Sequence, residues 1–131
     1  MTTSFKWADI YSVGNELIDG QHKNMFEIAN SIPENFTDKS LKKTIVNLYK
    51  HALKHFDAEE GLMKQTGYEN TAEHIRQHNN LVSRLNDITE KPFRTDEDLL
   101  KFKKFVYGWI IEHIMQQDKM FFDFIKRQKK T

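Results

Sequence analysis

The sequence predicts an all-α protein, an up-down-up-down four-helix bundle with an ordered N-terminal arm. Only 2 prolines and 5 glycines occur in 131 residues, which favours long helices over many short strands. Apolar residues recur at steps of three and four along four long segments, which is the spacing of one face of an α-helix. The connections between these segments are short, and short connections place successive helices side by side and antiparallel.

Composition and charge fit a single domain, residues 1–131, that is long enough to bury a core. The 20 Lys and Arg against 19 Asp and Glu give a net charge of only +1, so we expect no nucleic acid and no anionic membrane as a partner. The absence of cysteine excludes disulfides, zinc–thiolate sites and iron–sulfur clusters. No apolar run could span a bilayer, and the N-terminus lacks the apolar core of a signal peptide. We therefore expect a cytoplasmic protein, and a monomer.

Residues 1–17 are expected to form an arm packed along the outside of the bundle. Their apolar residues follow no clean period: Phe5, Trp7, Ile10, Tyr11, Val13 and Leu17. The first helix is predicted at about 19–36, beginning near Asp19, and Pro33 should kink or end it in its last turn. Its inward stripe would be His22, Met25, Phe26, Ala29, Ile32 and Phe36.

The second helix is predicted at about 40–64, and Gly67 supplies the backbone conformation needed to leave it. The third helix is predicted at about 71–89. Asn70 and Glu73 match a capping box at its start, and Lys91-Pro92 ends it.

The fourth helix is predicted at about 96–128. Thr95 would cap it, and three acidic residues follow where the helix dipole is positive. Its inward stripe would be Leu99, Phe102, Val106, Trp109, His113, Met120 and Phe124. Its basic end, which suits the negative pole of the dipole, contains Lys126, Arg127, Lys129 and Lys130.

Each predicted helix carries metal-capable residues on its inner face. They are His22 on the first, His55 and Glu59 on the second, His74 and His78 on the third, and His113 and Asp118 on the fourth. A spacing of four residues puts two side chains on one helical face, one turn apart. Burying such polar groups costs free energy unless other polar groups or a metal satisfy them. Asp118 follows His113 by five residues, about 140° apart on an ideal helix, so the pair would flank the metals or the helix would widen locally.

Each of these residues alone also fits an ordinary structural role. A single inward histidine is usually a satisfied core residue, and a single carboxylate is usually solvated. His51 precedes His55 by four residues but lies beside the apolar stripe, so we interpret it as a boundary residue. Five imidazoles and two carboxylates together are too many for one ion and fit two ions bridged by the carboxylates. Nitrogen-rich ligation favours iron, copper, nickel or zinc over magnesium or calcium.

The motifs resemble those of the hemerythrin family, in its single-domain bacterial form, nearly from end to end. In order they are W-A-D-I-Y-S-V-G, I-D-G-Q-H, H-F-D-A-E-E-G-L-M, H-I-R-Q-H and W-I-I-E-H-I-M-Q-Q-D. The resemblance implies two non-haem iron ions with an oxo or hydroxo bridge. His74, His78 and His113 would bind one iron, and His22 and His55 the other. Glu59 and Asp118 would bridge the two.

The resemblance further implies reversible binding of dioxygen, as a hydroperoxide, at the open position of the two-histidine iron. We expect a non-enzymatic protein that carries, stores or buffers oxygen, with Ile110 as a candidate lining residue of the oxygen pocket. An oxygen or redox sensor, or a di-iron enzyme acting on peroxide or nitric oxide, is the alternative. Ferritin-like di-iron oxidases use Glu-x-x-His pairs, and this sequence contains none.

Overall fold

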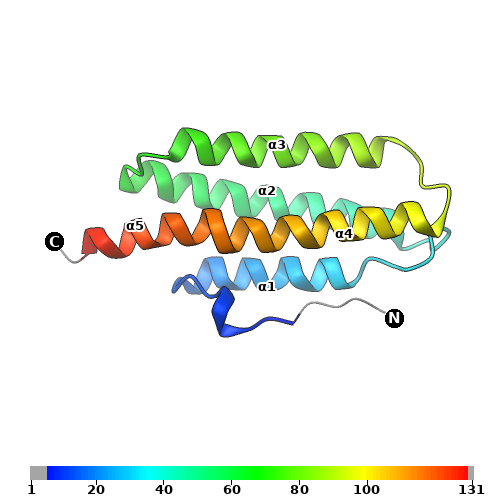
Figure 1. The fold of residues 1–131 in the computed structure, drawn as a ribbon, viewed down its shortest axis with the longest axis horizontal. Helices are drawn as coiled ribbons and strands as arrows, with labels where there is room; N and C mark the ends of the chain where they lie inside the picture. Colours follow the sequence, from blue (N-terminus) through cyan, green and yellow to red (C-terminus); the bar gives the residue numbers. More distant parts are fainter. Residues whose placement is uncertain (1–5, 130–131) are drawn as a thin grey trace.

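The computed structural model describes residues 6–129 of the chain. They form four antiparallel helical rods, with an N-terminal arm along the outside of the first rod (Figure 1). The elements are η1 (Asp9–Tyr11), α1 (Glu16–Asn30), α2 (Leu41–Thr66), α3 (Thr71–Glu90), α4 (Asp96–Glu112), η2 (His113–Asp118) and α5 (Lys119–Lys129). The fourth rod consists of α4, the π-helix η2 and α5, end to end. The predicted fold class is confirmed, and residues 6–129 contain no strand.

Helix α1 differs from its predicted range of 19–36 at both ends. It begins at Glu16 because the Asn15 side chain caps it, accepting a 3.1 Å hydrogen bond from the backbone N–H of Ile18. It ends at Asn30, before Pro33, since a proline lacks the helical donor and disfavours helical backbone in the residue before it. The arm is therefore shorter than the predicted 1–17.

The arm is anchored to α1 by aromatic contacts and by one acidic side chain. Trp7 and Tyr11 each pack against Phe26, with ring centroids 5.7 and 5.2 Å apart. Asp19, predicted to begin α1, lies inside it and accepts hydrogen bonds from the Val13 N–H at 2.9 Å and the Ser12 hydroxyl at 2.6 Å. Residues 6–15 lie along the outside of α1, except that the Val13 side chain is buried in the core, and Phe5 lies outside the described residues.

Helices α2 and α3 run close to their predicted ranges. Gly67 follows α2 with a φ of 69°, the left-handed conformation expected of it. The predicted capping box is wrong, because the Asn70 side chain makes no capping hydrogen bond at the start of α3. Glu73 instead pairs with the guanidinium of Arg76, one turn further along the helix.

The fourth rod is not the continuous α-helix predicted for 96–128. Thr95 caps α4 as predicted, accepting from the Asp98 N–H at 3.1 Å. The π-helix η2 then inserts one extra residue into the helical repeat, so every side chain after it changes face by one position. Met120, predicted to point inward, is 52% exposed, and Phe121 is fully buried in its place. The predicted basic end falls on α5, except that Lys130 lies outside the described residues.

Two clusters of buried apolar side chains form the core. The larger contains side chains from all four rods, among them Phe26, Leu48, Leu85 and Phe102. The smaller consists of Val13, Ile18, Met63, Tyr68, Phe121 and Phe122. On α2, Glu59 lies between Phe56 of the larger cluster and Met63 of the smaller one, so a polar layer separates the two.

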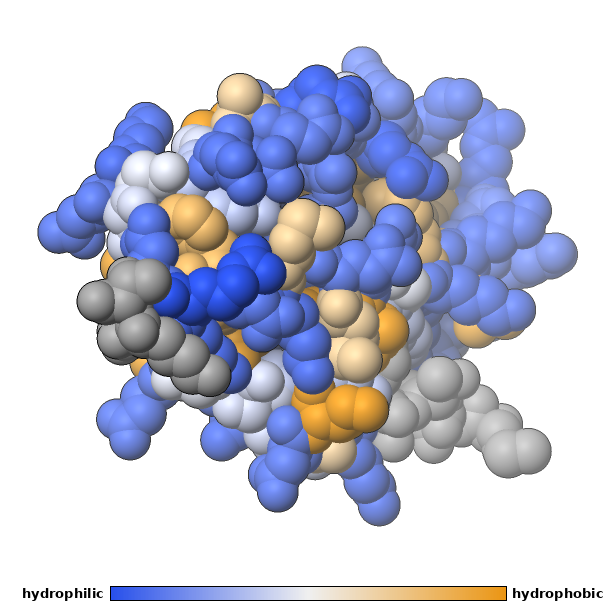
Figure 2. Space-filling model, turned by 60° about the vertical axis from the view of Figure 1, so that its left-hand side comes forward, coloured by the Kyte–Doolittle hydropathy of each residue, from blue (hydrophilic) through white to orange (hydrophobic). Residues whose placement is uncertain are grey.

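The face of the molecule shown in Figure 2 is mainly hydrophilic. In the face shown in Figure 2, hydrophobic side chains appear as small patches between hydrophilic ones. Among residues 6–129, no helix combines the length and the hydrophobicity that crossing a membrane would require.

Candidate metal centre

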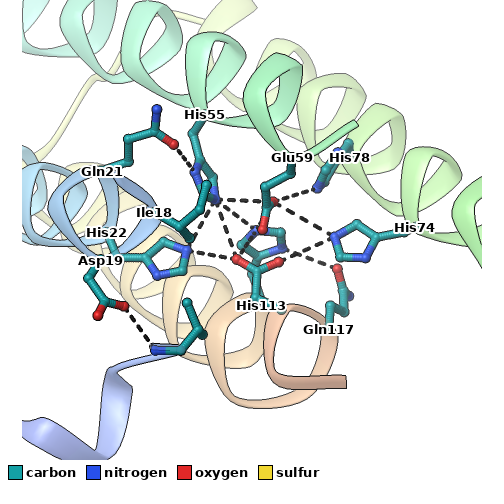
Figure 3. A network of polar contacts seen from close by, with 12 residues as sticks. Ile18, Asp19, Gln21, His22, His55, Glu59, His74, His78, His113 and Gln117 are labelled. Atoms are coloured by element: carbon teal, nitrogen blue, oxygen red, sulfur yellow. Dashed lines mark hydrogen bonds and ion pairs between the residues drawn. The ribbon is translucent and has the colours of Figure 1, made fainter. Parts of the chain in front are cut away.

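The structure brings all seven candidate metal-binding side chains together in the polar layer between the two core clusters (Figure 3). They come from α1, α2, α3 and η2, so every rod contributes. Each is at most 5% exposed: His22, His55, Glu59, His74, His78, His113 and Asp118. The ring nitrogens and carboxylate oxygens form two overlapping groups, each with its atoms within 4.8 Å of one another.

The π-helix places two of these residues on the same side of the fourth rod. His113 Nε2 and Asp118 Oδ2 lie 3.0 Å apart although the residues are five positions apart in sequence. A π-helix closes its hydrogen bonds over five residues instead of four, so this spacing returns to the same face. Of the two arrangements that the sequence left open for His113 and Asp118, the structure therefore has the locally widened helix.

Asp118 faces histidines on both sides of the cluster. Its Oδ2 atom lies 2.7 Å from His22 Nε2, and its Oδ1 atom lies 3.3 Å from His74 Nε2. Glu59 approaches through one oxygen, with Oε1 3.1 Å from both His55 Nε2 and His113 Nε2. Asp118 Oδ2 also lies 3.4 Å from His55 Nε2 and 3.0 Å from His113 Nε2. The two oxygens of Asp118 together therefore reach histidines from all four rods, as a carboxylate shared by two cations would.

Three polar side chains contact histidine Nδ1 atoms, the outer nitrogens, which point away from the cluster. Gln21 Oε1 is 2.8 Å from His55 Nδ1, and Gln117 Oε1 is 3.2 Å from His113 Nδ1. Glu60 Oε2 is 3.1 Å from His78 Nδ1. An Nδ1–H that donates outward leaves the lone pair of Nε2 directed into the cluster, as a metal ligand requires.

These contacts with Nδ1 were not predicted from the sequence. Gln117 follows His113 by four residues, so helical spacing could have identified it. Glu60 adjoins Glu59, but only the structure shows that its side chain reaches His78 on the neighbouring helix.

The electrostatics of the metal-free cluster keep both carboxylates ionised. Burial alone would raise the pKa of Glu59, but the neighbouring His55 and His113 lower it to about 2. Burial likewise opposes ionisation of Asp118, yet His113 holds its pKa well below the usual value. Burial would lower the pKa of His113, but Asp118 and Glu59 raise it well above the usual value. Without a bound cation, protons on the histidines thus balance the negative charges of the two buried carboxylates.

Several buried atoms have no hydrogen-bond partner in this arrangement. They include Glu59 Oε2, His74 Nε2, His78 Nε2 and Asp118 Oδ1. In addition, His55 Nε2 lies 3.1 Å from His22 Nε2 and 3.3 Å from His113 Nε2, a close approach of lone pairs that only protons or cations can stabilise. Unpaired buried polar atoms are costly in a folded protein. The residues therefore fit a centre that holds metal cations.

Two other residues considered from the sequence lie outside the cluster of donors. His51 is partly exposed and lines a surface groove with Gln21 and Lys54, as expected of a boundary residue. Ile110 is fully buried in the larger apolar cluster, one helical turn before His113.

Comparison with known proteins identifies one family over most of the chain. Residues 13–125 match the family described as "Hemerythrin HHE cation binding domain". The bacteriohemerythrin of Clostridium acetobutylicum is 30% identical over 128 residues, covering 91% of this chain and 99% of the relative. That of Pseudomonas aeruginosa is 27% identical, covering 92% of this chain and 80% of the relative.

Solved structures show the same fold. Two crystal structures of hemerythrin mutants superpose with TM-scores of 0.77 and 0.76 at 24% identity. Each comparison covers 92% of this chain and 95% of the other.

The expected cofactors, two non-haem iron ions, are confirmed by the family match together with the cluster of buried donors. The family is one of di-iron proteins that bind oxygen, which agrees with the nitrogen-rich donor set. With a family match over residues 13–125 and a relative at 30% identity, the chain belongs to the hemerythrin family, as its motifs indicated.

Proposed function

We propose that this chain binds dioxygen reversibly at its di-iron centre and serves to carry, store or buffer it. His74, His78 and His113 would hold one iron, and His22 and His55 the other. Glu59 and Asp118 would be shared between the two. The proposal includes no enzymatic turnover.

The observation that carries this assignment is the position of Asp118. Its two oxygens face His22 on one side and His74 on the other, and these two histidines come from α1 and α3. A carboxylate so placed supports two ions over a single ion surrounded by all seven donors.

The unequal number of histidines around the two proposed iron positions supports a specific binding position for dioxygen. One side has three imidazoles and the other has two, so the two-histidine iron would have one position free for dioxygen. When bound, a pair of ferrous ions supplies two electrons to dioxygen, one from each ion.

The chain's own contribution is to keep water and proton donors away from this position. His22 and His55 are fully buried, and so is Ile18, which lies beside His22 in Figure 3. The polar side chains of Gln21 and Gln117 contact the outer nitrogens of the histidines, away from the interior. A dry apolar site would favour return of the two electrons and release of dioxygen over loss of the reduced oxygen as peroxide, because that loss needs water or a proton donor. We place Ile110 in the lining of the oxygen pocket on the same argument, because it is fully buried one turn from His113.

The test is a visible absorption spectrum of the reduced protein loaded with iron, taken with a metal count. We expect two irons per chain and an absorption band that appears in air and disappears under vacuum over repeated cycles. One-way conversion to the ferric form would instead support a sensor or an enzyme. Fewer than two irons per chain after careful reconstitution would contradict the assignment of ligands.

A further inference from the structure

We infer that Glu60 is a positioning residue that makes His78 a stronger metal donor than the other histidines and so favours the ferric state of the ion that His78 holds. The inference rests on the proposed function, since it assigns His78 to an iron.

Glu60 and His78 meet across the interface between α2 and α3. Glu60 Oε2 lies 3.1 Å from His78 Nδ1, on the opposite side of the ring from the cluster. His78 Nε2 lies 3.4 Å from Glu59 Oε1, inside the cluster. Because an ionised carboxylate can only accept, Nδ1 must donate its proton to Glu60. The tautomer with a free lone pair on Nε2 is therefore fixed.

The ring of His78 is also held in place by packing. Phe56 stacks on it with ring centroids 3.9 Å apart and an interplanar angle of 10°. His78 is 1% exposed, whereas the Glu60 side chain is 23% exposed. The imidazole is thus rigid and dry while its carboxylate partner keeps contact with solvent, which lowers the cost of holding a negative charge there.

The other outer contacts are uncharged. His55 and His113 donate to the amide oxygens of Gln21 and Gln117. His22 Nδ1 is buried without a hydrogen-bond partner. No carboxylate among residues 6–129 contacts Nδ1 of His74, whose ion pairs with Glu59 and Asp118 are made through Nε2. Within the described part of the chain, His78 is therefore the one histidine of the cluster with a carboxylate on its outer nitrogen.

This difference has a chemical consequence. An anionic acceptor draws the Nδ1 proton toward itself, so the imidazole becomes more basic and its Nε2 a stronger donor. The full negative charge of Glu60 adds to this effect, and both favour Fe(III) over Fe(II). A neutral amide fixes the tautomer without supplying the charge. One side chain outside the ligand set thereby adds to the difference in redox chemistry that the unequal number of histidines already gives the two ions.

The test is the reduction potential of the protein loaded with two irons, compared with that of Glu60→Gln. Glutamine keeps the size of the side chain and its acceptor oxygen but removes the charge. Loss of the hydrogen-bond partner of a metal ligand typically lowers metal affinity by about 10–100-fold. If about tenfold is lost from the ferric state alone, the potential rises by about 59 mV.

The control is Asp57→Asn, which removes the same charge from the same helix. Asp57 is exposed and makes no hydrogen bond or ion pair with any of the seven donors. We expect its potential to match that of the unsubstituted protein. A potential for Glu60→Gln that equals the control, or that falls, overturns the inference while the proposed function stands.

A second variant decides the matter if Glu60→Gln fails to fold or to hold two irons. Gln117→Glu places a carboxylate on the outer nitrogen of His113, and we expect the potential to fall by a similar amount. An unchanged or higher potential in this variant overturns the inference. If the unsubstituted protein itself does not hold two irons, the proposed function fails and the inference with it.

Discussion

His113 and Asp118 are five residues apart in sequence, yet His113 Nε2 lies 3.0 Å from Asp118 Oδ2. The π-helix between them makes this contact possible and also changes the face of every residue that follows. One local feature therefore sets both the position of a candidate metal donor and the packing of α5.

The first prediction tests the packing of α5. Phe121→Ala should reduce the free energy of unfolding by about 3–5 kcal/mol, because Phe121 is fully buried in the smaller core cluster. Met120→Ala should change it by less than about 0.5 kcal/mol, because Met120 is 52% exposed. Guanidinium unfolding of the metal-free variants measures both values. The reverse order would mean that the fourth rod is a continuous α-helix.

Hydrophobic periodicity was sufficient to predict the four rods and their inner faces, because each face is set by residues close in sequence. Six of the seven candidate donors could be proposed for the same reason, because each occupies an inward position on a regular helix, such as His55 and Glu59 on α2. Asp118 reaches the cluster only through the π-helix, which the sequence offered as one of two alternatives. The amino-acid sequence alone was therefore sufficient to predict the fold class.

The features that sequence reasoning missed depend on contacts between segments or on helix pitch. The predicted inward face of Met120 was wrong because a regular α-helix through His113–Asp118 would turn Met120 inward, whereas the π-helix there turns Phe121 inward instead. The capping box at Asn70 was wrong: the Asn70 side chain makes no capping hydrogen bond, and Glu73 pairs with Arg76 instead. The contact between Glu60 and His78 joins two helices, and no spacing along one helix predicts it.

The second prediction separates a metal donor from a nearby histidine. His74→Ala should lower the iron content of reconstituted protein, because His74 is 5% exposed and its Nε2 atom faces Asp118 at 3.3 Å. His51→Ala should retain the full content, because His51 lines a surface groove outside the cluster. Elemental analysis against protein concentration measures both. Equal losses would show that helix α2 presents a different face to the metals.

The third prediction concerns the arm. Asp19→Ala removes the acceptor of two hydrogen bonds, one from the buried Val13 backbone N–H and one from the Ser12 hydroxyl. We expect a loss of about 1–3 kcal/mol in stability, mainly from the unsatisfied N–H. The rate of hydrogen exchange at the Val13 amide should also increase in Asp19→Ala. Ser12→Ala, which leaves the Val13 bond intact, should have a smaller effect on both measurements.

The fourth prediction is that the metal-free protein loses stability as the pH falls. Glu59 has a pKa of about 2 in the folded protein against a usual 4.5, so its contribution is present above pH 4.5 and is lost as the pH falls toward 2. That contribution is on the order of 3 kcal/mol. The pKa values of His22 and His78 are lowered by burial, so their protonation below about pH 6.5 acts in the same direction.

The histidines with raised pKa values do not oppose this loss. The pKa values of His55 and His113 lie above their usual value because of the carboxylates, so their contribution is complete below pH 6.5 and stays constant as the solution becomes more acidic. Guanidinium midpoints between pH 6.5 and 3 should therefore fall steadily. In Glu59→Gln the dependence between pH 4.5 and 3 should be weaker, and an equal slope in both proteins would show that Glu59 is not held ionised in the folded state. Because the same carboxylate and imidazole atoms must lose their protons to bind iron, acid should also release the metal from the loaded protein.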